Sequence, residues 1–217
     1  MSESKVGIQV APQEGVGRRE LLIRSAAIFG GSSLLISELS AQSGPTDLTL
    51  LNFALTLENL EAAFYTQGLA QFSSTDFGNS TLLQNFGNVI GGDVYAYLSI
   101  IRDHEAQHVR TLQSLITSLG GTPAKPCSYN FGYKTADDFL MVAATLENAG
   151  VSAYDGAMSQ ITTASLKTAA ATIATVEARH SAYLNMLTNT LPFPASFDTP
   201  ATSAAILSAA GKYITAC

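Results

Sequence analysis

Two short sequence patterns, each present twice, contain the residues best suited to chemistry. The first is TLEN followed by a tyrosine seven residues after the glutamate, and it occurs within residues 56–65 and 145–154. The second is Glu-Ala-x-His, at residues 105–108 and 177–180. Along the chain they give the order E, ExxH, E, ExxH. The residues concerned are Glu58, Glu105, His108, Glu147, Glu177 and His180.

These residue types at this spacing predict a site for two metal ions. Residues i and i+3 are neighbours on a helix, so the two side chains of each ExxH point the same way. Four carboxylates and two imidazoles that converge in a helical bundle can hold two divalent cations, and iron and manganese both suit such ligands. The alternative is that all six lie on solvated helix faces. It is less favoured because Glu58 and Glu147 stand inside apolar runs, where an unpaired carboxylate is costly.

Four long amphipathic segments carry these patterns and are predicted to be helices. They are residues 46–72, 93–119, 135–160 and 165–190. Apolar residues recur at helical spacing, and Gly120-Gly121-Thr122-Pro123 ends the second segment. The connections 73–92, with one short helix near 82–86, and 120–134 are long. The sequence therefore predicts an all-α four-helix bundle with an internal two-fold repeat and a long crossover between helices two and three.

Composition and charge exclude several classes of protein. The 217 residues are 47% hydrophobic and 13% charged, which excludes an intrinsically disordered chain. The net charge is −6, and no cluster of Lys and Arg follows residue 24, so we expect no nucleic-acid partner. Two cysteines are too few for a four-cysteine zinc site.

The first 43 residues are predicted to be a leader, and residues 44–217 the folded domain. The leader contains Arg18-Arg19, which resembles a twin-arginine signal, and then the apolar stretch AAIFGGSSLLI at residues 26–36. This stretch is too short to span a bilayer, and a basic region, a short apolar region and small residues are typical of a secretory signal. We therefore expect cleavage, export to the periplasm or the extracellular space, and no membrane span. A disordered tail is the alternative.

The chain resembles the ferritin-like superfamily of di-iron and di-manganese carboxylate proteins, and within it an exported, desiccation-related branch. The resemblance covers residues 46–217, including the terminal Cys217, and is carried by LNFALTLENLEAAFY, DHEAQH, PCSYNFGY, TLENAGVSAY, VEARHSAYL and PFPASFDTP. It implies that Glu58 and Glu147 are terminal or bridging ligands. It also implies that each ExxH supplies a bridging glutamate and one histidine.

The chain departs from this superfamily just before each ExxH. Many members have Asp there to hydrogen-bond a ligand histidine, whereas this chain has His104 and Val176. The candidates to replace that Asp are Tyr65, Tyr154, Asn59, Asn148 and Asp103. For the two tyrosines, ordinary core packing is the alternative. We expect His104 to be partly exposed or to hydrogen-bond a ligand. We expect Glu61 to lie at the surface or beside the site rather than to bind metal, because Gly150 takes its place in the repeat.

Cys127 and Cys217 are predicted to form a disulfide, because exported proteins meet an oxidising environment. The pairing would close a loop of about 90 residues and stabilise the fold by about 4 kcal/mol. Two free thiols are the alternative.

Two functions fit these patterns. The first is redox chemistry with O2 or peroxide at two metal ions, of peroxidase, catalase or ferroxidase type, which would protect against oxidative or desiccation stress. The second is a non-catalytic stress protein in which the metals are structural and their binding free energy stabilises the fold. The sequence does not choose between iron and manganese, or between a monomer and a homo-oligomer.

Overall fold

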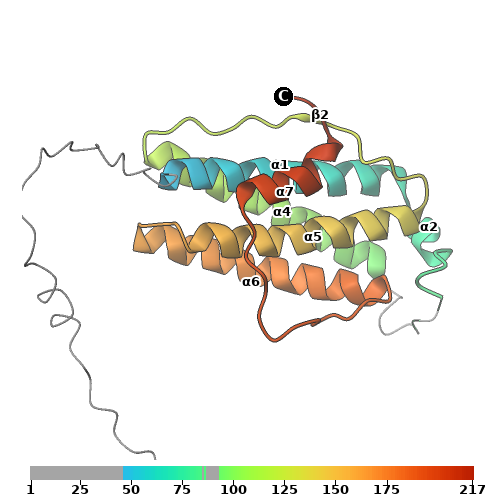
Figure 1. Cartoon of the computed structure of the whole chain (residues 1–217). Helices are drawn as coiled ribbons and strands as arrows, with labels where there is room; N and C mark the ends of the chain where they lie inside the picture. The colour runs from blue at the N-terminus through green and yellow to red at the C-terminus, as the bar shows by residue number, and fades with distance from the viewer. Residues whose placement is uncertain (1–45, 85, 87–92) are drawn as a thin grey trace, which may run out of the picture. The chain divides into compact units, whose positions relative to one another are not determined.

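Four long helices form the bundle that the sequence predicts. The computed structural model describes residues 46–84, 86 and 93–217, so the predicted leader and its cleavage site lie outside the described residues. The long helices are α1 (Asp47–Gln71), α4 (Val94–Ser118), α5 (Ala136–Met158) and α6 (Ala164–Leu187). Each begins within one residue of its predicted start. Figure 1 shows α1 packed along α4, and α5 along α6. The prediction of an all-α bundle is confirmed.

Local sequence signals determine where these helices begin and end. Thr46 caps α1, and its hydroxyl oxygen accepts the Thr49 N–H at 3.3 Å. Thr135 and Asp138 form a reciprocal capping box at the start of α5. Gly120 follows the end of α4 with φ of 75°, a conformation that favours glycine. The stop predicted at residues 120–123 is therefore present.

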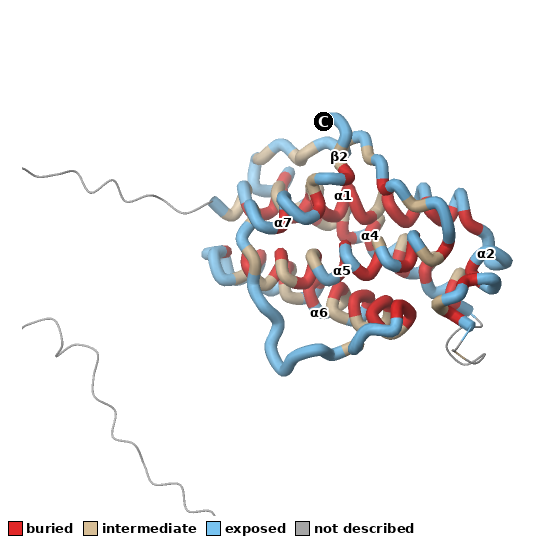
Figure 2. Tube along the Cα trace, turned by 45° about the vertical axis from the view of Figure 1, so that its right-hand side comes forward, coloured by how far each residue is buried: buried red, intermediate tan, exposed pale blue. Residues whose placement is uncertain are grey.

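The core consists of two apolar clusters with the polar residues of the repeat between them. One cluster surrounds Phe64 and Phe139, whose rings stack with centroids 4.5 Å apart. The other surrounds Leu55 and Ile116. On each long helix, the repeated glutamate lies where the helix passes from one cluster to the other. Figure 2 shows the buried positions facing the interior of the bundle.

Several short elements were not predicted from the sequence. They are α2 (Ser74–Gly78), α7 (Ser203–Ala210), η2 (Gly211–Tyr213), and the antiparallel strands β1 (Ser128–Tyr129) and β2 (Ile214–Ala216). Residues 82–84 form a turn instead of the predicted short helix. Next to the small sheet, Cys127 and Cys217 form a disulfide with an S–S distance of 2.03 Å. The C-terminus is thus tied to the connection between α4 and α5.

Among the described residues, every helix is too short or too polar to span a bilayer.

Candidate metal centre

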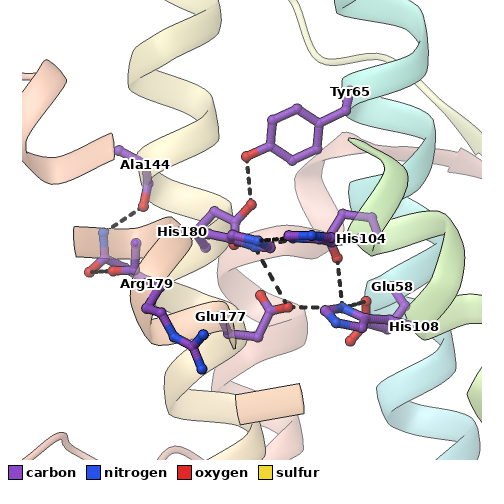
Figure 3. A network of polar contacts seen from close by, with 12 residues as sticks. Glu58, Tyr65, His104, His108, Ala144, Glu177, Arg179 and His180 are labelled. Carbon is purple, nitrogen blue, oxygen red and sulfur yellow. Dashed lines mark hydrogen bonds and ion pairs between the residues drawn. The ribbon is translucent and has the colours of Figure 1, made fainter. Parts of the chain in front are cut away.

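The six residues of the repeated patterns meet inside the bundle. Glu58 comes from α1, Glu147 from α5, and the two ExxH pairs from α4 and α6. All four glutamates are 0% exposed, and His108 and His180 are 8% and 5% exposed. Figure 3 shows side chains from separate helices pointing toward one another. The carboxylates and imidazoles therefore lie in surroundings closed to bulk water.

Three carboxylates surround one nitrogen of His108. Its Nδ1 lies 3.2 Å from Glu58 Oε2, 3.2 Å from Glu105 Oε2 and 3.1 Å from Glu177 Oε1. One ring N–H cannot serve three carboxylate oxygens well. Ligand atoms of these four residues all lie within 4.8 Å of one another, which is the grouping expected around a metal ion.

His180 has similar surroundings. Its Nδ1 lies 3.1 Å from Glu105 Oε1, 3.2 Å from Glu147 Oε2 and 4.0 Å from Glu177 Oε1. These four residues form a second set of ligand atoms within 4.8 Å of one another. Glu105 and Glu177 belong to both sets, so the two sets lie side by side.

Several oxygens of the cluster accept no hydrogen bond. Glu58 Oε2, Glu105 Oε1 and both carboxylate oxygens of Glu177 are buried without a hydrogen-bond partner. Buried polar atoms in this condition are costly and rare. A divalent cation would satisfy these oxygens, and imidazole and carboxylate are ligands that iron and manganese accept. The residues present therefore fit a metal ion, and the cluster is able to hold one.

Proton affinities in the cluster reflect the crowding of charge. Burial raises the pKa of Glu58 to about 8, although its close contact with His108 opposes the rise. Burial alone would lower the pKa of His108, but its close contacts with Glu105, Glu177 and Glu58 raise it to about 12. Close contacts with Glu105 and Glu147 likewise raise the pKa of His180 to about 9. Burial would raise the pKa of Glu105, but a hydrogen bond from His108 and a close contact with His180 lower it to about 2. Without metal, the folded cluster thus holds protons that a cation would displace.

Each of the two repeated tyrosines extends across the cluster to a glutamate on the opposite helix. Tyr65 donates a hydrogen bond to Glu147 Oε1 at 2.5 Å, and Tyr154 donates one to Glu58 Oε1. Burial raises the pKa of both hydroxyls well above their usual range, so both remain donors. Each tyrosine thus holds one oxygen of the glutamate on the opposite helix. The sequence left open whether these tyrosines hydrogen-bond residues of the site or only pack in the core. The structure shows the hydrogen bonds.

His104 lies beside His180 (Figure 3). The two rings lie edge to edge in nearly one plane, with centroids 5.3 Å apart and planes 14° apart, and His104 Nδ1 lies 3.0 Å from His180 Nε2. This contact leaves His180 Nδ1 directed at the carboxylates. His104 is exposed on its other side, as expected from the sequence. Val176, at the same place in the second ExxH, has no polar atom in its side chain to act in this way.

Three of the five predicted hydrogen-bond partners are not bonded to the cluster. Asp103 is exposed and pairs with Arg102 at 2.9 Å. It precedes Glu105 by two residues, which puts it nearly on the opposite side of the helix. Asn148 bonds to Asn185 at 2.7 Å. Asn59 is buried with its Nδ2 unpartnered. Both asparagines follow a glutamate of the cluster by one residue, which turns them about 100° away from the site.

Glu61 was predicted to lie at the surface or beside the site, and its surface placement is wrong. It is 3% exposed, one turn after Glu58 on α1. Burial raises its pKa well above the usual range, and nearby carboxylates raise it further, Glu177 most of all. The signal was the spacing of three residues from Glu58, which puts both on one helix face. In the repeat, however, Gly150 stands at the position equivalent to Glu61, and this mismatch argued against a role for Glu61 in the site.

Comparison with known proteins agrees with this architecture. Residues 46–190 match the family described as the ferritin-like domain. This match covers more than half of the chain and includes all six residues of the cluster. The chain therefore belongs to the ferritin-like domain family.

Two individual proteins are also similar to this chain. Protein rds1 of Schizosaccharomyces pombe (strain 972 / ATCC 24843) is 25% identical over 171 residues, which are 79% of this chain and 40% of rds1. The chain thus spans less than half the length of that relative. The crystal structure of a conserved hypothetical protein, rv2844, from Mycobacterium tuberculosis has 20% sequence identity and a TM-score of 0.47, covering 70% of this chain and 96% of that one. The family assignment rests on the family match.

Proposed function

We propose that the buried cluster binds two divalent metal ions, iron or manganese. Glu58 and His108 would hold one ion, Glu147 and His180 the other, and Glu105 and Glu177 would belong to both. The observation that carries this proposal is the set of buried carboxylate oxygens without hydrogen-bond donors, gathered around two histidine nitrogens. Four carboxylates also balance the charge of two divalent ions.

The proposed activity is redox chemistry with O2 or peroxide, of ferroxidase, peroxidase or catalase type. A bound pair of iron or manganese ions supplies two-electron chemistry toward such small substrates. The chain's own part is to hold and protect the site. Tyr65 and Tyr154 fix two carboxylates, His104 fixes one imidazole, and the apolar clusters on both sides exclude water.

The proposed setting is outside the cytoplasm, with a role in oxidative or desiccation stress. The disulfide between Cys127 and Cys217 supports a non-reducing compartment. The arginine pair and apolar stretch of the first 43 residues support export. Neither the disulfide nor the first 43 residues include a residue of the cluster, so the proposal of export does not depend on metal binding.

A structural role for the metals is the second candidate, and one observation favours it. The four glutamates are 0% exposed, so a substrate would have to enter through a closed bundle. In that case metal binding would mainly add to the free energy of folding.

Two measurements separate these candidates. Protein loaded with Fe2+ or Mn2+ is mixed with O2 or H2O2, and turnover is followed. Its thermal unfolding is then compared with and without a chelator. Turnover that is lost in the double variant Glu147→Ala, His180→Ala supports the redox function. A large drop in melting temperature with chelator, and no turnover, supports the structural role.

A further inference from the structure

Glu61 is a buried carboxylate that the six-residue cluster does not use. It lies on α1 between Glu58 and Tyr65, both of which belong to the site or contact it. It is 3% exposed, and the charges that most affect it are those of Glu177, Glu147, Glu58 and Glu105. Placing a fifth carboxylate among four others is unfavourable unless a positive charge or a proton compensates.

The opposite helix leaves room for this carboxylate. In the repeat, Gly150 of α5 takes the place that Glu61 takes on α1. A Cβ atom at Gly150 would lie 3.1 Å from Glu177 Oε2 and 3.2 Å from Glu61 Oε1. Two carboxylate oxygens therefore converge beside a position without a side chain. Glu177 Oε2 is buried and accepts no hydrogen bond there.

We propose that Glu61 is a seventh protein ligand of the metal pair, bound on the side where α5 has Gly150. The inference rests on the proposed function, because it requires the metal pair. Glu61 belongs to neither of the two sets of mutually close ligand atoms. In this proposal it adds an oxygen to an ion that is held mainly by the other residues. The site then lacks the two-fold symmetry of the sequence repeat, and its two metal ions have unequal surroundings.

The competing explanation is that Glu61 stays protonated, shares its proton with Glu177 and binds no metal. Glu61→Gln distinguishes the two, because an amide resembles a protonated carboxyl but is a poor ligand. Gly150→Ala keeps every charge and fills the space between the two oxygens. Asp103→Asn is the matched control, because it removes one negative charge from an exposed residue near the site.

The experiment is a calorimetric titration of metal-free protein with Mn2+, for the full chain and the three variants. We expect two Mn2+ per chain in the parent protein. We expect at least a tenfold loss of affinity for one of them in Glu61→Gln and in Gly150→Ala, and no change in Asp103→Asn. In Co2+-loaded protein, the visible absorption should strengthen in Glu61→Gln, because bands of Co2+ strengthen as its ligand number falls. Circular dichroism of each metal-free variant checks that it is folded.

Each other outcome contradicts the inference. Parent-like affinity in Glu61→Gln means that Glu61 is not a ligand. A loss in Glu61→Gln with parent-like binding in Gly150→Ala and an unchanged Co2+ spectrum means that Glu61 acts only through its charge. Both results leave the proposed metal pair intact. If the parent protein binds no Mn2+ and no Co2+, the proposed function and this inference fail together.

Discussion

The two oxygens of each single glutamate have different surroundings. Oε1 of Glu58 and of Glu147 accepts a hydrogen bond from a tyrosine of the other repeat, whereas Oε2 lies 3.2 Å from a histidine nitrogen. A buried bond of this kind would orient the carboxylate before a metal ion binds. Hydrogen bonds to ligands from outside the coordination sphere commonly change metal affinity by about 10- to 100-fold.

We therefore expect Tyr65→Phe and Tyr154→Phe each to weaken binding of one metal ion by about tenfold. The cause is the loss of the hydroxyl that orients the glutamate on the opposite helix. Calorimetric titration with Mn2+ measures the effect. Tyr95→Phe is the matched control, because its hydroxyl bonds to the Leu69 carbonyl, away from the cluster, at 3.3 Å. Equal affinities in all three variants would contradict this role of the tyrosines.

At the residue scale, the sequence was sufficient to find the cluster and insufficient to find all that surrounds it. The six central residues could be found because repeated ExxH and TLEN patterns are rare by chance. The full burial of Glu61 and the choice of His180 as the partner of His104 were not foreseen. They depend on which helix faces which, and that is a property of tertiary packing.

The contacts of α5 depend on glycines at two close approaches. A Cβ atom at Gly68 of α1 would lie 2.1 Å from the buried ring of Phe139 on α5. One at Gly156 of α5 would lie 2.0 Å from the backbone oxygen of Ala201, in the segment before α7. Neither neighbour can move without disturbing packed structure. These glycines therefore set how closely the elements approach.

Gly68→Ala and Gly156→Ala are each expected to lower the free energy of unfolding by about 1–3 kcal/mol through overpacking. This loss should exceed the small gain in helix propensity that alanine brings. Gly78→Ala, in α2, is the control, because nothing lies within 4 Å of its added Cβ. Urea unfolding measures all three. A stability equal to that of Gly78→Ala in both test variants would show that the close approaches are not needed.

The long helices could be predicted because each has apolar residues at helical spacing and recognisable starts and stops, such as Thr135 and Gly120. The small elements near the C-terminus could not. Strands of two and three residues are too short to show an alternating pattern of apolar residues. β1 and β2 are also far apart in the sequence and pair only once the chain has folded. α7 packs on the apolar cluster around Phe64 and Phe139, to which its Ile206 belongs.

At the scale of the whole molecule, the disulfide joins the chain end to the connection between α4 and α5. Cys127 and Cys217 are 90 residues apart in sequence. We expect the double variant Cys127→Ser, Cys217→Ser to lose about 4 kcal/mol of unfolding free energy, because the unfolded chain regains its freedom. Urea unfolding with and without a reductant tests this. The reductant should destabilise the parent protein alone, and a parent unaffected by complete reduction would contradict the prediction.

The pH dependence of stability should depend on whether the cluster holds metal. In metal-free protein, the pKa of Glu58 is raised from 4.5 to about 8 and that of His180 from 6.5 to about 9. The folded state then binds more protons than the unfolded state, so this stabilisation is present at low pH and is lost as pH rises from about 5 to 9. The lowered pKa of Glu105, about 2, acts below this window.

We therefore expect the melting temperature of the chelator-treated protein to fall between about pH 5 and 9, and Mn2+ affinity to rise over the same range as protons are displaced. Calorimetric melts and titrations at several pH values measure both. The double variant Glu147→Ala, His180→Ala should show a weaker pH dependence of affinity. A metal-free melting temperature that rises with pH would contradict the proton balance described for the cluster.

The most direct test of the central claim is elemental analysis of the protein purified from its native compartment, beside the double variant Glu147→Ala, His180→Ala. We predict two iron or manganese ions per parent chain and a clear loss in a double variant that still folds. A parent protein without bound iron or manganese, or a double variant with the same metal content as the parent, would contradict the claim that these buried side chains form a metal centre.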